Sequence, residues 1–475
     1  MGARSIQLAM ASLLAALAAI SSAPAHAQMA ADHPLSEVRT VGRLLDEHPK
    51  DDLHIVLIHG IRTADRKTWD EFRLLLCAHL GDRCAKTISI RTTDRLVLQA
   101  DPPRADYFGQ EVWADDGPSV PNRHDAEAKW RGSQPFVDHY LVGLKDGRHL
   151  FIDEINWWPL VLAFKCQFVV PTDADLVGPD KDNIATCAAD DDVHFPWLTR
   201  SHQADLMGIH PISGGAPWLN GVLKNQIMDW GISDAVLSLG TLKSWLRKTV
   251  RCAFNDIATE TTSDFGGPGS SQDRTVTCDD YERSGGASPR PSGQFALISH
   301  SLGAFLLMDT FAAAAADSHE YPQLGADQCR VSVGPDALPK ADDTGEFAAE
   351  ISRGSQSLCL VLAESGQLYF LANQFPLLEL ARTQFYRSSD HRSSFESALK
   401  LWAHIGSAVS EQKQIVAFSD PGDILTFKVP PIDGAKVINA YPHNAFRWFG
   451  IMEWPPSAHV NYLTKKEVLS VVFGG

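Results

Sequence analysis

The sequence predicts an α/β fold in which a mostly parallel sheet is flanked by helices. Residues 53–58 are apolar on both faces, as expected of a buried parallel strand, and they end at His59-Gly60. Residues 69–80 follow with the apolar spacing of a helix. Residues 295–299 form a second apolar strand that runs into a tight turn and another helical stretch. Repeated units of strand, turn and helix are typical of α/β proteins.

Further patterns extend this domain. Strand-like runs occur at residues 137–144, 149–157, 368–371 and 415–419, and the first two flank the turn signal Asp146-Gly147. Helical spacing occurs at residues 218–230, 236–254 and 465–473. Two segments have the composition of surface loops: 263–293, which is dense in Gly, Ser, Pro and Asp, and 331–354. We expect a leader at 28–52 and one α/β domain at 53–475, with an insertion at about 166–293.

Charge excludes one class of partner. The chain has 475 residues with 42 basic and 58 acidic side chains, a formal net charge of −16. Binding to nucleic acid requires a basic face against the phosphates, so we expect no nucleic-acid partner.

The N-terminal segment has the pattern of a secretory signal peptide. Arg4 precedes an apolar run at residues 8–20, and Ala25 and Ala27 supply a small-x-small cleavage pattern before Gln28. The apolar run is shorter than the roughly 20 residues of a membrane span. We predict that residues 1–27 are removed, that the protein is exported to the periplasm or the medium, and that it has no integral membrane segment.

The cysteine count agrees with export. An even number of cysteines, eight, favours disulfides in an oxidising compartment. Eight cysteines allow 105 pairings, among which the sequence alone does not choose. The scheme that pairs neighbours gives Cys77–Cys84, Cys166–Cys187, Cys252–Cys278 and Cys329–Cys359. None of the spacings forms a CxxC zinc knuckle, so the cysteine pattern predicts no structural zinc.

A candidate nucleophile follows the strand at residues 295–299. The sequence Ser299-His300-Ser301-Leu302-Gly303 leads into a helical stretch of small and apolar residues. A nucleophile on such a turn needs small residues two positions before and after it, and the usual pattern is Gly-x-Ser-x-Gly. Ser299 departs from that pattern but is small. We predict that Ser301 is the nucleophile and that the Leu302 amide, at the helix N-terminus, faces the developing oxyanion.

A serine nucleophile needs a histidine base and a carboxylate that orients the histidine. Two acids follow the strand at residues 415–419, and we favour Asp423 because Asp420 is beside Pro421 and suits a turn cap. His459 precedes the last helical stretch and is our predicted base, with His443 as the alternative.

These motifs resemble those of the α/β-hydrolase superfamily, in which the triad follows the order Ser, acid, His. The resemblance rests on residues 55–62, 299–303 and 420–423 and on His459. It implies an α/β-hydrolase-type sheet with a large insertion before the nucleophile strand. It also implies a second oxyanion amide after His59-Gly60, from Ile61 or, if the loop is shifted by one residue, from Arg62. The run His59-Gly60-Ile61-Arg62 is similar to that of lipase- or esterase-like members.

The expected function is therefore that of an exported serine esterase or lipase without metal or organic cofactor. We expect a small-molecule or lipid-like ester as its substrate. The aromatic residues at 446–454 suit an apolar acyl pocket for such an ester, but residues of this kind are more often plain core, which is the interpretation we favour. An amidase, thioesterase or acyltransferase uses the same triad, and a non-catalytic binding protein on this scaffold is the alternative from another class. Whether residues 166–293 form a lid is left open.

Overall fold

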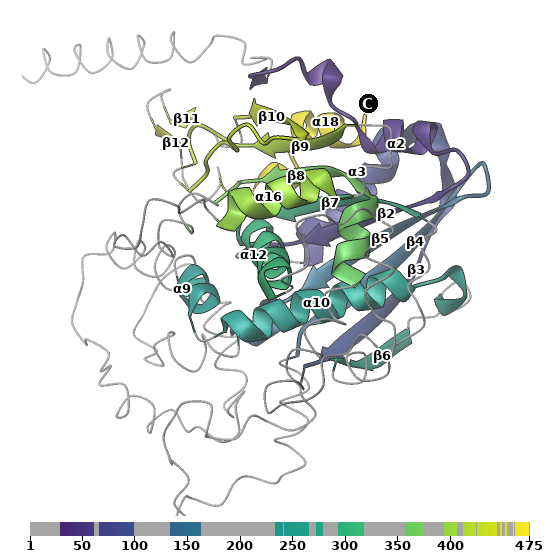
Figure 1. Ribbon diagram of the computed structural model, residues 1–475. Coiled ribbons are helices and arrows are strands. Elements are labelled where there is room, and N and C mark those ends of the chain that lie inside the picture. Colours follow the sequence, from purple (N-terminus) through teal and green to yellow (C-terminus); the bar gives the residue numbers. More distant parts are fainter. Residues whose placement is uncertain are drawn as a thin grey trace, which may run out of the picture.

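The computed structural model describes about half of the chain, including the sheet and the helices that cover it (Figure 1). The described residues are 29–60, 66–98, 134–162, 233–240, 242–265, 272–278, 293–317, 357–374, 378, 394–405, 412–423, 425–443, 447–448, 452–453, 459 and 461–474. The predicted signal peptide at residues 1–27, the helical pattern at 218–230 and the polar segment at 331–354 lie outside them.

A mixed sheet of ten strands forms the centre of the described structure, in the order β1-β10-β9-β8-β7-β2-β5-β4-β3-β6. The strands are β1 (Ala30–Ala31), β2 (Asp52–Ile58), β3 (Cys84–Val97), β4 (Phe136–Leu144), β5 (His149–Asn156), β6 (Gln272–Thr277), β7 (Gly293–His300), β8 (Ser365–Leu371), β9 (Lys413–Phe418) and β10 (Ala435–Tyr441). From β10 to β5 every neighbouring pair is parallel, whereas β5-β4 and β4-β3 are antiparallel. The edge strand β1 is antiparallel to β10, and β6 is parallel to β3. Strands β11 (Arg447–Trp448) and β12 (Met452–Glu453) form a separate antiparallel pair.

Helices cover both faces of the sheet (Figure 1). On one face lie α10 (Lys243–Thr259), α12 (Leu302–Asp317) and α16 (Ser394–His404), with α9 (Ser233–Leu239) packed against α10. On the other lie α2 (Val41–Glu47), α3 (Arg66–Leu80) and α18 (Lys466–Phe473). Short 3-10 turns occur at η1 (Leu35–Glu37), η2 (Gly81–Arg83), η5 (Thr262–Asp264) and η7 (Asn461–Leu463). The predicted α/β class is confirmed.

The packing of strand β2 explains why its sequence from Leu53 to Ile58 is apolar apart from His54. Val56 and Ile58 pack in the core beneath α10 and α12, whereas Leu53, Ile55 and Leu57 pack in the core beneath α3 and α18. Successive side chains of a strand point to opposite faces, so a strand with helices on both sides needs apolar residues at every position.

The predicted hairpin is confirmed. Strands β4 and β5 pair antiparallel, with Val137 opposite Ile155. Gly147 in the connecting turn has φ +89°, a conformation that a residue without Cβ adopts readily.

Two expectations for the insertion were wrong. The helical pattern at residues 236–254 belongs to two helices, α9 and α10, and Gly240, a poor helix former, follows the end of α9. The segment 263–293 is not simply an exposed loop, because β6 lies within it and pairs with β3. Val276 of β6 is buried in the sequence Thr275-Val276-Thr277, a short β-branched run that the surrounding polar residues obscured.

The residues assigned to a leader also contribute to the fold. Strand β1 pairs with β10, and α2 buries Val41, Leu44 and Leu45 against the core on the α3 and α18 side. The Thr40 side chain caps α2 by accepting a hydrogen bond from the Arg43 amide.

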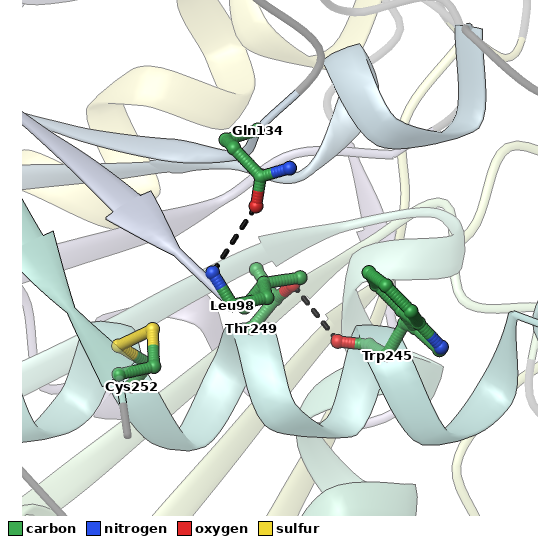
Figure 2. The surroundings of a disulfide bond; sticks show 6 residues. Leu98, Gln134, Trp245, Thr249 and Cys252 are labelled. Carbon is green, nitrogen blue, oxygen red and sulfur yellow. Dashed lines mark hydrogen bonds between the residues drawn. A yellow bond between two sulfur atoms is a disulfide. The ribbon is translucent and has the colours of Figure 1, made fainter. Parts of the chain in front are cut away.

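Two of the four predicted disulfides are present: Cys77–Cys84 and Cys252–Cys278. Cys84 is the first residue of β3, and its bridge joins that strand to α3. The second bridge joins α10 to the residue after β6 (Figure 2). The predicted pairs Cys166–Cys187 and Cys329–Cys359 include residues outside the described structure.

The described helices were compared with the length and apolar character of a membrane span, because we predict no integral membrane segment. In the described part of the chain, no helix combines the length and the apolar character that crossing a bilayer requires.

Candidate active site

Ser301 occupies a sharp turn between β7 and α12. Its φ of +54° lies in the left-handed region, which a residue with a Cβ adopts at a cost. Its amide donates a hydrogen bond to the carbonyl of Leu371 in the neighbouring strand β8, at 2.7 Å. A strained, strand-to-helix serine is the geometry expected of a nucleophile elbow.

Two glycines allow the chain to pack closely around this turn. A Cβ on Gly303 would lie 2.4 Å from the carbonyl oxygen of Ile58 and 2.6 Å from that of His59. A Cβ on Gly60 would lie 2.4 Å from the Cβ of Ser301. The first turn of α12 therefore rests directly on the end of β2, where a larger residue does not fit without movement of the backbone.

Ser299 replaces the first glycine of the usual motif. Its side chain is buried, and its hydroxyl donates a hydrogen bond to the carbonyl of Tyr369 in β8, at 3.4 Å. The departure from glycine is accommodated because the added hydroxyl has a partner.

The structure brings Ser301, His459 and Asp423 together. Ser301 Oγ lies 2.7 Å from His459 Nε2, and His459 Nδ1 lies 2.7 Å from Asp423 Oδ2. With the proton on Nδ1, the imidazole donates to the carboxylate and accepts from the serine hydroxyl. The side chain of Asp423 is held by the Leu425 amide, which donates to Oδ1 at 3.0 Å. The three residues form a continuous hydrogen-bonded chain.

The two alternative residues are in different environments. Asp420 Oδ1 accepts a hydrogen bond from the Gly422 amide at 2.7 Å, the contact of a turn cap. Its own amide is held by the hydroxyl of Tyr462. His443 follows the end of β10 and is half-buried. The partner of Ser301 Oγ is His459.

Gln374 is a neighbour of the triad that sequence reasoning missed. It follows the end of β8, its side chain is buried, and its Nε2 lies 3.2 Å from His459 Nε2. The one sequence signal for Gln374 was its position just after a strand. Because the carboxyl ends of parallel strands meet at one edge of the sheet, such a residue can lie beside Ser301.

His300 holds the backbone of His459, the predicted base. Its Nε2 donates a hydrogen bond to the carbonyl of His459 at 2.9 Å, and the two rings lie 5.5 Å apart. Burial, together with the charge of a protonated His459, lowers the pKa of His300 to about 3, so this imidazole is neutral at physiological pH. The hydrogen bond to the His459 carbonyl gives His300 a structural role beside the predicted base.

His59 fixes the end of β2 beside the turn. Its ring stacks on Trp157, whose Nε1 donates a hydrogen bond to the carbonyl of His59 at 2.8 Å. Burial lowers the pKa of His59 to about 4, so it is also neutral. Trp157 is buried in the core, whereas the side chains of the aromatic segment 446–454 lie outside the described structure.

The predicted oxyanion amides are described in part. Leu302 is the first residue of α12, and first-turn amides of a helix have no partner within the helix. Ile61 and Arg62, which follow Gly60, lie outside the described residues.

Comparison with known proteins adds no relative. No protein-family model matches this chain, and neither a curated protein nor a solved structure matches it.

Proposed function

We propose that this protein is an exported serine hydrolase with an α/β-hydrolase fold that cleaves carboxylic esters. The observation that carries the proposal is the hydrogen-bonded chain from Ser301 through His459 to Asp423, with 2.7 Å at each link. A serine, a histidine and a buried acid in this geometry are the parts of a nucleophilic triad, which is recognised by geometry and roles.

Each residue of the chain has a defined task in ester cleavage. Ser301 Oγ attacks the carbonyl carbon while its proton passes to His459 Nε2. Asp423 stabilises the imidazolium, and the Leu302 amide, with that of Ile61, stabilises the oxyanion. The intermediate collapses with loss of the alcohol, which takes the proton from His459. Water, deprotonated by His459, then attacks the acyl carbon, and collapse returns the proton to Ser301 Oγ and releases the acid.

The topology supports the superfamily assignment. Ser301 follows β7, Asp423 follows β9, and His459 comes after β10 and the β11–β12 pair. The chain order Ser, Asp, His is that of the α/β-hydrolases. Ser301 and Asp423 both lie just after the carboxyl ends of parallel strands, the edge at which open α/β sheets bind ligands.

Part of the predicted insertion belongs to the α/β domain itself. Of residues 166–293, helix α10 packs on one face of the sheet and β6 pairs with β3, so these two elements are not lid elements. The two disulfides support export, since such bonds persist in oxidising compartments.

A fluorophosphonate probe tests the proposal. The purified wild type should form a covalent adduct at Ser301, and Ser301→Ala should form none. Ser299→Ala is the matched control, because it removes an equally buried hydroxyl two residues away and should still be labelled. Absence of labelling of the folded wild type would mean that the protein is a non-catalytic binding protein on this scaffold.

Two further measurements address substrate and export. A series of p-nitrophenyl esters of rising chain length, assayed with wild type and Ser301→Ala, should show hydrolysis by the wild type alone. Matched amide and thioester substrates identify an amidase or thioesterase. N-terminal sequencing of the exported protein should begin at Gln28.

A further inference from the structure

A second cluster of charged side chains is buried between the sheet and α10. Its members come from five elements: His54 of β2, Asp94 of β3, His139 of β4, Asp153 of β5, and Asp256 and Glu260 at the end of α10. The strand residues share one face of the sheet, since His139 is directly opposite Asp153 and the remaining partners are an even number of positions away. The six side chains are between 0% and 9% exposed.

His139 lies among four carboxylates. Its Nδ1 is 2.9 Å from Asp153 Oδ1 and 3.0 Å from Glu260 Oε1. On the other side of the ring, Nε2 is 3.0 Å from Asp256 Oδ2 and 3.6 Å from Asp94 Oδ2. One imidazole has two nitrogens, so it cannot satisfy all four carboxylates.

The positive charge around these acids falls short of their negative charge. Arg274 of β6 forms a bidentate ion pair with Asp94 and neutralises it. The ion pairs of Asp153, Asp256 and Glu260 are formed with His139 and His54. A buried charge is costly unless it is paired or ligates a metal. Three carboxylates that share two histidines carry excess negative charge unless one of them binds a proton or the cluster binds a further cation. Burial raises the pKa of Glu260 and of Asp256, so a proton takes this place where no cation is bound.

The carboxylate of Glu260 is the member of the cluster with the fewest partners. Its side chain is 1% exposed, and its Oε1 lies 3.0 Å from His139 Nδ1, but neither carboxylate oxygen makes a hydrogen bond of good geometry. A buried carboxylate normally accepts several hydrogen bonds, and an orphaned one requires a physical reason.

His54 presents a nitrogen to the same place. Its ring is stacked between Phe151 and Phe295, with centroids 4.3 and 4.7 Å away, and its Nδ1 lies 3.3 Å from Asp153 Oδ2. Ligand atoms of His54, Asp153 and Glu260 all lie within 4.8 Å of one another. A tetrahedral zinc ion bound at 2.0–2.2 Å holds its ligand atoms about 3.3–3.6 Å apart, so side-chain movements of up to about 1.5 Å would close the site.

We propose that His54, Asp153 and Glu260 bind a divalent transition-metal ion, with Zn²⁺ or Mn²⁺ as the fitting ions. The imidazole nitrogen decides the class, because Ca²⁺ and Mg²⁺ prefer oxygen ligands alone. The ion supplies the charge that the three carboxylates lack and gives Glu260 a partner. The cysteine pattern did not indicate this site, because its ligands are a histidine and carboxylates from two strands and a helix end.

Neighbouring groups hold the proposed ligands in place. His139 Nδ1 lies beside Asp153 Oδ1, so it can donate to a ligating carboxylate, as the outer partners of metal sites do. The Cys252–Cys278 bridge anchors α10 two turns before Glu260 (Figure 2). The ion would therefore join β2, β5 and the end of α10.

The proposed site is separate from the triad. His54 precedes Gly60 by six residues along β2 and its end, a distance of about 20 Å at roughly 3.3 Å per residue. The metal would stabilise the fold without touching Ser301. The proposal does not rest on the proposed ester hydrolysis.

Metal content and thermal unfolding test the site in the full-length, exported chain without a histidine tag. The protein is stripped with EDTA, dialysed against Zn²⁺ or Mn²⁺, and freed of excess metal. We expect about one equivalent of metal per wild-type chain and a melting temperature that rises on loading. Glu260→Gln should lose the bound metal and the rise. Asp138→Asn is the matched control: Asp138 is also buried but faces the opposite side of β4, where it accepts a hydrogen bond from Thr93 Oγ1, and this variant should keep the metal.

Two results would overturn the proposal. The first is that the wild type retains neither metal and that its melting temperature changes with neither metal nor EDTA. If Glu260→Gln is then as stable as the wild type, Glu260 carries a proton in place of a metal. The other is equal metal retention by Glu260→Gln and wild type. If Glu260→Gln does not fold, the Co²⁺ spectrum of the wild type decides: nitrogen and oxygen ligation supports the site, and thiolate ligation excludes it.

Discussion

Ser301 Oγ and His459 Nε2 lie 2.7 Å apart although 158 residues separate them in the chain. The Ser301 amide donates a hydrogen bond to the carbonyl of Leu371 in β8, and the carbonyl of His459 accepts one from the ring of His300 in β7. Both residues are therefore held by strands of the central sheet. A pair fixed in this way is pre-organised for proton transfer, which requires heavy atoms within hydrogen-bond reach.

The acid of the triad gives the first prediction. Asp423→Asn should preserve the fold, because Oδ1 can still accept from the Leu425 amide, yet it should lower kcat about 10⁴-fold. An amide donor beside Nδ1 favours the tautomer with the proton on Nε2, which cannot accept the serine proton. Asp420→Asn is the control and should cost far less, since its Oδ1 still accepts from the Gly422 amide. Steady-state ester hydrolysis measures both; a larger loss in Asp420→Asn would reverse the assignment.

The base gives a second prediction. His459→Ala should abolish turnover, since Ser301 Oγ loses its hydrogen-bond acceptor. His443→Ala should alter stability or KM and leave kcat nearly unchanged. The same ester assay, with circular dichroism as a check of folding, separates the two. Near wild-type kcat in His459→Ala would exclude it as the base.

Close packing at the turn gives a third prediction. Gly303→Ala would place a Cβ 2.4 Å from the carbonyl oxygen of Ile58, a backbone atom that cannot rotate away. We expect a loss of about 2 kcal/mol or more in the free energy of unfolding, in line with overpacked cores, together with reduced activity. Gly143→Ala is the control, because its Cβ would meet only the Cβ of Ala85 at 3.9 Å. Urea unfolding measures both, and equal stability of the two variants would contradict the prediction.

The buried His300 gives a prediction about pH. An unfolded histidine binds a proton below about pH 6.5, whereas His300 in the folded protein remains neutral down to about pH 3. Between these values the unfolded state binds one more proton. The contribution of His300 is therefore fully present above pH 6.5, and it decreases by up to about 1.4 kcal/mol per pH unit on acidification.

His300→Gln isolates this effect, because glutamine has an N–H that can donate to the His459 carbonyl but does not titrate. The free energy of unfolding of the wild type should fall more steeply between pH 6 and pH 4 than that of the variant. Denaturant unfolding at a series of pH values measures the two slopes. Parallel profiles over this interval would show that His300 is accessible to protons in the folded state.

The two disulfides should differ in their contribution. The bridge Cys252–Cys278 closes a loop of sequence separation 26, and Cys77–Cys84 one of separation 7. Chain entropy predicts about 3.5 kcal/mol for the longer loop and about 2.4 kcal/mol for the shorter one. The double variant Cys252→Ala/Cys278→Ala should therefore unfold at lower denaturant than Cys77→Ala/Cys84→Ala. A reversed order would mean that native contacts, and not loop length, govern the bridges.

Local patterns in the sequence were enough for the α/β class and for the strands around the site. Strand β2 is apolar from Leu53 to Ile58, apart from His54, because both of its faces are covered, and that pattern is visible without a structure. The turn at Ser301 was equally visible, because its small residues and following helix are neighbours in sequence. Asp423 and His459 followed from their positions after a strand and before the last helix.

Other features depended on contacts between distant segments. Strand β6 is a short polar run that becomes a strand by pairing with β3. The paired segments are distant in the chain: Arg274 of β6 and its partner Asp94 of β3 are 180 residues apart. Gln374 and His300 acquire a role only where β7, β8 and the His459 segment converge. The buried cluster around His139 likewise joins four strands and a helix end, and its significance lies in burial and unmatched charge. The sequence by itself determined which segments could be strands, helices and a nucleophile turn, because these depend on neighbours along the chain. Only the tertiary structure decided which polar groups meet, because desolvation and hydrogen bonding depend on neighbours in space.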